Sequence, residues 1–166
     1  FDPQTMFSIY NGIDFTPIVP KLTREEYLRS VGLETDAESV VFGIAARLDP
    51  VKDVATLIRG FALAQKEQPD IRLLIAGDGE QRQMLEALAA ELCPKGSCVF
   101  AGWVTDMDSF YNAIDVNTLT SISETFPYAI TEGARVRCAT IASNVGGIPY
   151  IIEHGVTGLL FPPQDE

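Results

Sequence analysis

Short apolar runs alternate along the chain with longer segments whose apolar residues recur at helical spacing. The runs themselves show no apolar–polar alternation, which is typical of parallel strands covered on both faces. The expected strands are residues 8–10, 40–45, 71–76, 98–101, 115–119, 140–142 and 159–161. The expected helices are residues 24–31, 53–66, 80–92, 107–113, 128–137 and 149–153. This order predicts an α/β fold, a doubly wound, Rossmann-like parallel sheet with helices on both faces.

Local signals mark the ends of two of these helices. Thr23 followed by Glu26 forms a capping box in front of the first helix, and Gly32 marks its end. Pro127 suits the first turn of the helix at 128–137, where a missing N–H costs nothing.

The fold predicts where a ligand binds. In doubly wound sheets, ligands lie outside the carboxyl ends of the strands. In this chain those ends are the loops at residues 47–52, 77–79, 102–106, 121–127 and 144–147.

Composition indicates one globular domain. The 166 residues are 46% hydrophobic and 21% charged, enough for a good core. We expect a linker and capping helix at residues 1–35, and the ligand-binding domain at residues 36–166.

Charge and cysteine content exclude several classes of protein. A net charge of -11 argues against a nucleic-acid partner and against anionic lipid. No apolar run approaches the roughly 20 residues of a membrane span, so no membrane contact is expected from this segment. Cys93, Cys98 and Cys138 lack the further Cys/His pair of a zinc site, and we expect free thiols in a reducing cytoplasm.

Two of the loops carry groups suited to a nucleotide diphosphate. Arg47 and Lys52 could clamp a diphosphate, although their spacing alone would favour two solvated side chains. Glu124 and Glu132 stand eight residues apart, about 12 Å along a helix, which is too far for an acid/base pair on one bond. The spacing suits two ends of one long ligand, because a carboxylate grips vicinal hydroxyls and a helix N-terminus favours an anion between them.

The flanks of these glutamates carry a resemblance. Glu124-x7-Glu132 lies within Ser-x-Ser-Glu-x-Phe-Pro and is followed by residues 144–149, Asn-Val-Gly-Gly-Ile-Pro. This pattern resembles the nucleotide-sugar-binding half of retaining family-4 glycosyltransferases of the GT-B fold. The resemblance implies that Glu124 holds donor-sugar hydroxyls and Glu132 the ribose hydroxyls. Without these flanks, two solvated glutamates would be the simpler interpretation.

Other loops extend the resemblance over nearly the whole chain. Arg47 and Lys52 are similar to the family's pair on the donor diphosphate, so the implied catalytic residues are Arg47, Lys52 and Glu124. The implied donor-binding residues are Glu132, Thr125, Phe126, Tyr128, Gly77, Asp78, Val104 and Thr105. Trp103 fits a core position as well as a stacking platform.

Four positions depart from the family pattern. Thr125 stands where the family often has a glycine. Asp53 replaces a glycine after Lys52, and its carboxylate would weaken phosphate attraction if it pointed inward. Pro127 removes a backbone donor from the glutamate loop, and Arg137 stands in place of a glycine. These departures bear on donor affinity and sugar identity.

Other sites are not supported. Gly77-Asp78-Gly79 is not a dinucleotide fingerprint, because Arg82 stands where the third glycine would fall. His154, in an expected surface turn, lacks a matching catalytic constellation. No metal motif is present in a suitable loop, and neither a metal nor another cofactor is expected.

The resemblance implies one half of a GT-B enzyme that moves a sugar from a nucleotide-diphosphate sugar to a glycan, lipid or small-molecule acceptor. The anomeric configuration would be retained by front-face substitution, and a missing N-terminal domain of the same chain would bind the acceptor. We expect this segment alone to bind nucleotide weakly and transfer nothing. The alternatives are a non-catalytic nucleotide-sugar-binding or regulatory module, or another GT-B enzyme.

Overall fold

The computed structural model of the chain describes residue 12, residue 14 and residues 16–166. Within these residues, six strands form one sheet in the order β3-β2-β1-β4-β5-β6, and every pairing is parallel. The strands are β1 (Val40–Ala45), β2 (Ile71–Ala76), β3 (Cys98–Gly102), β4 (Val116–Leu119), β5 (Ala139–Ser143) and β6 (Leu159–Phe161). The predicted doubly wound sheet is confirmed.

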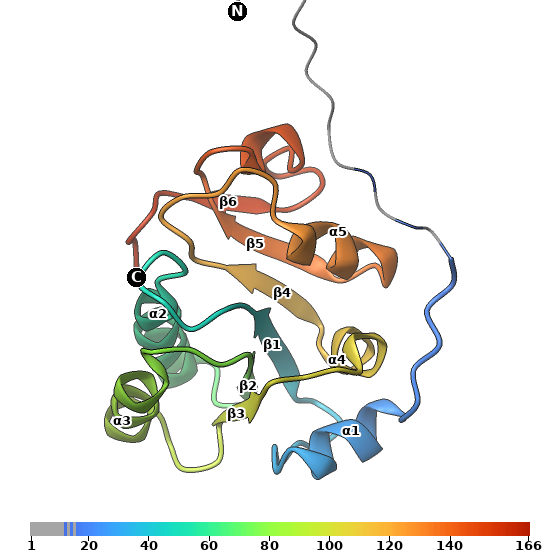
Figure 1. The fold of residues 1–166 in the computed structure, drawn as a ribbon. Coiled ribbons are helices and arrows are strands. Elements are labelled where there is room, and N and C mark those ends of the chain that lie inside the picture. Colours follow the sequence, from blue (N-terminus) through green and yellow to red (C-terminus); the bar gives the residue numbers. More distant parts are fainter. Residues whose placement is uncertain (1–11, 13, 15) are drawn as a thin grey trace, which may run out of the picture.

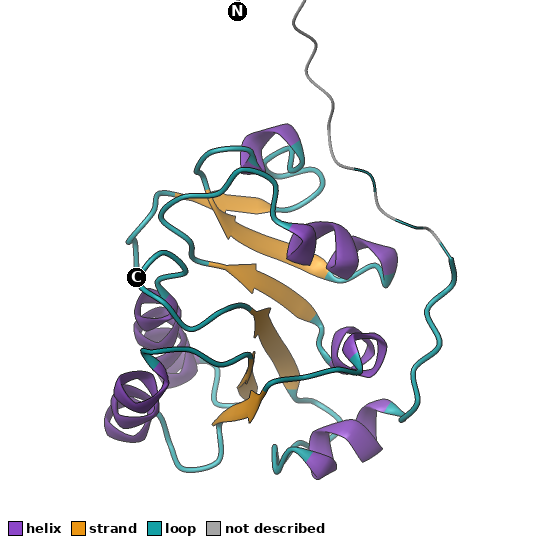
Figure 2. Ribbon diagram, viewed as in Figure 1, coloured by secondary structure: helices purple, strands orange, loops and turns teal. Residues whose placement is uncertain are grey.

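Helices cover both faces of the sheet. They are α1 (Arg24–Ser30), α2 (Val54–Glu67), α3 (Arg82–Leu92), α4 (Met107–Ala113) and α5 (Tyr128–Arg135), with a 3₁₀ turn, η2 (Ile148–Tyr150). Helices α2 and α3 lie on one face, and α1, α4 and α5 lie on the other (Figure 1). Figure 2 shows the sheet as the middle layer of three.

Strand β2 is apolar on both faces apart from Arg72, which is half-buried. Ile71, Leu73 and Ile75 pack into the core under α2 and α3, whereas Leu74 and Ala76 pack into the core under α1 and α4. A strand between two helical layers has no solvated face, so both sets of side chains must be apolar. Each fully buried aliphatic side chain contributes about 1.5–3 kcal/mol relative to exposure.

Several element boundaries differ from the sequence prediction. Helix α3 begins at Arg82, two residues later than expected, and α5 ends at Arg135. The helix expected at 149–153 is the single turn η2. The strand expected at 8–10 lies outside the described residues. The capping box at Thr23 and Glu26 is confirmed, with both reciprocal hydrogen bonds present.

One boundary changes the argument about the two glutamates. Pro127 is the N-cap residue of α5 and not part of its first turn, and the helix begins at Tyr128. Glu124 therefore lies in the loop before the helix, and a span of eight helical residues does not describe its separation from Glu132. Trp103 is 79% exposed, so a core position for it is wrong.

The loops that follow β1, β2 and β3 are joined by backbone hydrogen bonds. Leu48 N–H donates to Asp78 O at 2.9 Å, and Gly77 N–H donates to Gly102 O at 2.7 Å. On the other side of β1, Ile122 N–H donates to Val51 O at 2.9 Å. The carboxyl edge of the sheet is thus one connected surface, with its topological switch between β1 and β4.

No helix of the described residues is long and apolar enough to cross a membrane.

Candidate functional site

An ion pair joins the two sides of the topological switch. Lys52, after β1, places its Nζ 2.5 Å from Oε1 of Glu124, after β4. The Lys52 side chain is 25% exposed and that of Glu124 is 9% exposed. The structure therefore brings two of the predicted catalytic residues together in a largely desolvated position, where charge–charge interactions are stronger than in water.

Hydroxyl groups that the sequence analysis did not assign hold this pair in place. Ser121 Oγ donates to Oε1 of Glu124 at 2.7 Å, and Thr120 Oγ1 donates to the backbone oxygen of Lys52 at 2.9 Å. Ser143 Oγ, at the end of β5, donates to Ser121 O at 2.6 Å. Both bonds to Glu124 use Oε1, and Oε2 accepts no hydrogen bond from the described residues. The carboxylate is anchored by one oxygen and can accept from a ligand hydroxyl with the other.

Two glycines after β5 pack against the backbone of the loop that carries Glu124. A Cβ on Gly146 would lie 1.7 Å from Glu124 O, and one on Gly147 would lie 1.7 Å from Thr125 O. Gly147 N–H also donates to Glu124 O at 3.1 Å. In the sequence, Gly146-Gly147 belongs to the loop at residues 144–147 and to the pattern that carries the resemblance, but the sequence assigns these glycines no contact. Because Gly146 and Gly147 have no side chains, the loop after β5 contacts the backbone of the loop after β4 directly. This contact fixes the position of Glu124.

Arg47 does not join the Lys52–Glu124 pair. Its guanidinium forms a short ion pair with Asp49, and its side chain is 73% exposed. Burial opposes ionisation of Asp49, but hydrogen bonds from Arg47 and from the backbone of Lys52 and Val51 outweigh it and lower the Asp49 pKa below its usual range. Arg47 is a long, exposed cationic side chain at the rim of the site. To contact a diphosphate, its guanidinium would have to leave Asp49.

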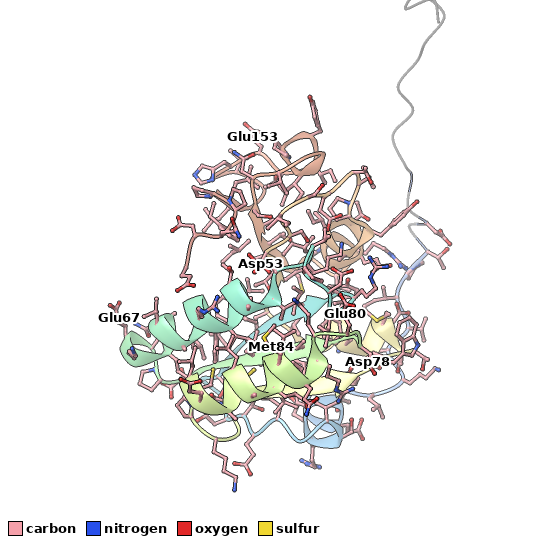
Figure 3. All side chains as sticks on the ribbon, turned by 60° about the vertical axis from the view of Figure 1, so that its left-hand side comes forward. Asp53, Glu67, Asp78, Glu80, Met84 and Glu153 are labelled. Atoms are coloured by element: carbon pink, nitrogen blue, oxygen red, sulfur yellow. The ribbon has the colours of Figure 1, made fainter. Side chains whose placement is uncertain are left out.

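The loop after β2 is held by close backbone approach. Gly77 has φ +134°, and a Cβ there would lie 1.8 Å from Ala46 O. Asp78 is exposed, and its Oδ1 accepts from the N–H of Gly79 at 2.8 Å. Figure 3 places Asp78, Glu80 and Asp53 at the same end of the α2–α3 pair, away from Glu67.

Arg82 is a residue of this edge that the sequence analysis used only to reject a cofactor motif. Its guanidinium pairs with Glu86 at 2.8 Å and with Asp78 at 3.4 Å, and it lies against Gly102. The hydrogen bond with Glu86 is the main cause of a raised Arg82 pKa. Arg82 thus links the loops after β2 and β3.

The remaining donor-binding candidates lie on loops of the same edge. Thr125 is exposed, Phe126 is half-buried, and Tyr128 is 50% exposed. The rings of Phe126 and Tyr128 pack edge to face at 5.9 Å. After β3, Val104 is half-buried and Thr105 is exposed.

Glu132 lies on α5 and has a partner that the sequence did not indicate. Tyr111, near the end of α4, donates its hydroxyl hydrogen to Oε2 of Glu132 at 2.9 Å. The two residues are 21 positions apart, on different helices, so no spacing rule connects them.

The structure shows how two of the departures are accommodated. Asp53 adopts φ 44° and ψ 48°, a left-handed conformation, and its Oδ2 accepts from Thr56 Oγ1 of α2 at 2.8 Å. Its carboxylate is engaged by the helix that follows. Arg137 also has a positive φ, of 63°.

A separate cavity of about 300 Å³ lies beside α2, lined largely by apolar side chains such as Phe42, Phe61 and Phe161. Such a lining does not suit a diphosphate. His154 lies in an exposed turn as expected, where its Nδ1 accepts from Leu160 N–H at 2.9 Å. The cysteines are free thiols, and the hydrogen bond with Cys93, together with burial, raises the pKa of Cys98.

The fold is a Rossmann-like domain with the Lys52–Glu124 ion pair at its topological switch. A model of the family Glycosyl transferases group 1 matches residues 25–166, and the chain belongs to that family. The chain is 32% identical over 162 residues to an uncharacterized glycosyltransferase of Methanocaldococcus jannaschii, covering 95% of this chain and 41% of that protein.

Solved structures share this fold. The crystal structure of Anabaena HepE in complex with UDP and glucose superposes with a TM-score of 0.80 at 27% identity, covering 95% of this chain and 43% of that one. The C-terminal domain of a Francisella tularensis glycosyl transferase group 1 protein has a TM-score of 0.77 at 24% identity, covering 92% of this chain and 80% of that domain. The chain thus spans less than half the length of the M. jannaschii and Anabaena proteins.

Proposed function

We propose that this chain is the donor-binding domain of a retaining glycosyltransferase that takes its sugar from a nucleotide-diphosphate sugar. The observation that carries the proposal is the Lys52–Glu124 pair at the topological switch, in a chain of this family. Similarity to Anabaena HepE, whose structure holds UDP and glucose, supports a nucleoside diphosphate as the bound group.

Each charged residue has a role in the proposal. Lys52, with Arg47 after it leaves Asp49, stabilises the negative charge that develops on the leaving diphosphate. Glu124 accepts from donor-sugar hydroxyls through Oε2, and Glu132 accepts from the ribose hydroxyls. Because these cations come from the protein, the proposal routes no step through a metal.

Backbone groups complete the proposed donor site. Thr125, Phe126 and Tyr128 line the sugar side, and Gly77 and Asp78 line the nucleotide side. Val104 and Thr105 lie beside the base. Phe126 and Tyr128 supply the amides next to Pro127, which has none.

The proposal includes a second domain of the same chain that binds the acceptor, because the relatives are more than twice as long as this segment. The acceptor is a glycan, lipid or small molecule. The free thiols support a reducing, cytoplasmic location.

Calorimetric titration with UDP, GDP and ADP tests the proposal, with Glu132→Ala beside the unchanged protein. We expect weak, millimolar-range binding of one nucleotide, weakened further in the variant. Absence of binding to all three at millimolar concentrations would contradict a nucleotide-binding function. Equal nucleotide affinity of the unchanged protein and Glu132→Ala would contradict only the role of Glu132 and would leave the nucleotide-binding function standing.

A further inference from the structure

The hydroxyl of Tyr111 is a fixed hydrogen-bond donor inside the α4–α5 contact. Tyr111 is 3% exposed, and its ring packs edge to face against Phe110, which is fully buried, with centroids 5.1 Å apart. Burial is the main cause of a raised Tyr111 pKa, and the carboxylate of Glu132 raises it further. The hydroxyl therefore keeps its proton at physiological pH and can only donate to an ionised Glu132.

This bond occupies one side of the Glu132 carboxylate. Tyr111 donates to Oε2 at 2.9 Å, whereas Oε1 accepts no hydrogen bond from the described residues. Tyr111 and Glu132 also line a small cavity of about 40 Å³ together with Met107 and Val136. Glu132 is anchored by one oxygen, as Glu124 is anchored by Ser121 and Lys52.

Anchoring matters because a glutamate side chain has three rotatable bonds. A free carboxylate loses conformational entropy when it is held against a ligand. A carboxylate that a buried hydroxyl already holds has lost part of this conformational entropy before the ligand binds, so binding costs less. The bond also sets the direction in which Oε1 points.

From this geometry we propose that Tyr111 is a positioning residue, which holds Glu132 so that Oε1 accepts from the ribose hydroxyls and the site selects ribonucleotides over 2′-deoxyribonucleotides. The inference rests on the proposed function, and it adds a residue and a selectivity to it. Tyr111 itself does not contact the nucleotide.

The chain contains a matched control. Tyr27, on α1, is 5% exposed and also packs edge to face on Phe110, with centroids 6.5 Å apart. Its hydroxyl is buried and has no hydrogen-bond partner among the described residues. Tyr27→Phe and Tyr111→Phe therefore remove the same atom from the two sides of one aromatic cluster, and only the second removes a bond to Glu132.

The experiment is calorimetric titration of the protein, Tyr111→Phe, Tyr27→Phe and Glu132→Gln with UDP and with 2′-deoxy-UDP. Unchanged protein should prefer UDP by roughly tenfold, the value of one good hydrogen bond to a charged group. Tyr111→Phe should weaken UDP roughly fivefold to tenfold and leave 2′-deoxy-UDP nearly unchanged, so that the preference shrinks. Tyr27→Phe should keep both affinities, and Glu132→Gln should lose the preference.

The outcomes separate the inference from the proposed function. If Glu132→Gln loses the preference while Tyr111→Phe keeps it, Tyr111 has no positioning role and the ribose role of Glu132 stands. Equal loss of both nucleotides in Tyr111→Phe would show a structural effect and contradict selectivity. If unchanged protein binds UDP and 2′-deoxy-UDP equally, the selectivity is wrong. If it binds neither of these, nor GDP or ADP, the proposed function is wrong as well.

Discussion

Arg137 occupies a backbone position that favours glycine. It follows α5 with φ 63°, and its N–H donates to Ala134 O at 3.0 Å while Cys138 N–H donates to Gly133 O at 3.1 Å. This pair of bonds is a Schellman motif, whose left-handed residue is usually glycine. The left-handed φ at this position explains why the family pattern has a glycine where this chain has Arg137.

Arg137→Gly should therefore stabilise the protein. Relief of left-handed strain contributes about 1–2 kcal/mol, and the added freedom of the unfolded chain costs about 0.5–1 kcal/mol. The expected net gain is about 0.5–1 kcal/mol, or roughly 1–4 °C in the melting temperature. Arg137→Ala is the control, since it removes the side chain and keeps the strain. A gain in both variants would show that strain is not the cause.

Because of Tyr27, the free energy of unfolding is expected to fall at alkaline pH. Burial is the main cause that raises the pKa of Tyr27 from 10.0 to about 12. Unfolded tyrosine ionises near pH 10 and folded Tyr27 near pH 12, so its contribution is complete below pH 10 and is lost as the pH rises to 12. The loss is about 2–3 kcal/mol.

Urea unfolding at pH 8, 10 and 11.5 measures this loss. Tyr27→Phe should remove only the part of the fall that Tyr27 causes, and at pH 8 should raise stability by about 1 kcal/mol, because the buried hydroxyl has no partner among the described residues. Part of the fall should remain, since the pKa of Tyr111 is raised too. An unchanged fall in the variant would contradict the assignment to Tyr27.

At the scale of elements, the site is made by loops that touch each other. Gly146 follows β5 and leaves room for the loop after β4, which carries Glu124. Its φ is +52°, so both its conformation and its missing side chain are required. The Lys52–Glu124 pair thus depends on a residue that follows β5, the strand after the Glu124 loop.

Gly146→Ala should destabilise the protein and displace Glu124. Strain and a clash with a backbone oxygen together should cost about 2–5 kcal/mol. Gly155→Ala is the matched control: its φ is +79°, but no atom lies within 4 Å of a Cβ there. That variant should lose only about 1–2 kcal/mol. Equal losses in chemical unfolding would show that the loop contact is unimportant.

For the molecule as a whole, the structure presents one edge of a sheet as the site, with Arg47 exposed at its rim. The relatives are much longer, and a partner domain is part of the proposed function. We therefore expect the 166-residue chain to release no measurable UDP from UDP-sugars in a coupled assay over hours. Robust turnover by this chain alone would contradict the need for a second domain.

The sequence by itself determined the layers, the parallel strands and the loops that carry the site. Apolar runs without alternation can be buried only between two helical layers, and in a parallel sheet all carboxyl ends meet at one edge. Arg47, Lys52 and Glu124 were selected by their place in those loops together with the resemblance that their flanking residues carry. The type of each residue and its position after a strand can be read directly from the sequence.

Only the tertiary structure decided which of these groups meet. Glu124 pairs with Lys52 and Ser121, Arg47 turns to Asp49, and Tyr111 reaches Glu132. These contacts join separate strands and helices, and they depend on loop height, helix boundaries and side-chain direction. Such features follow no period or fixed spacing along the chain, because they are set by the packing between helices and strands.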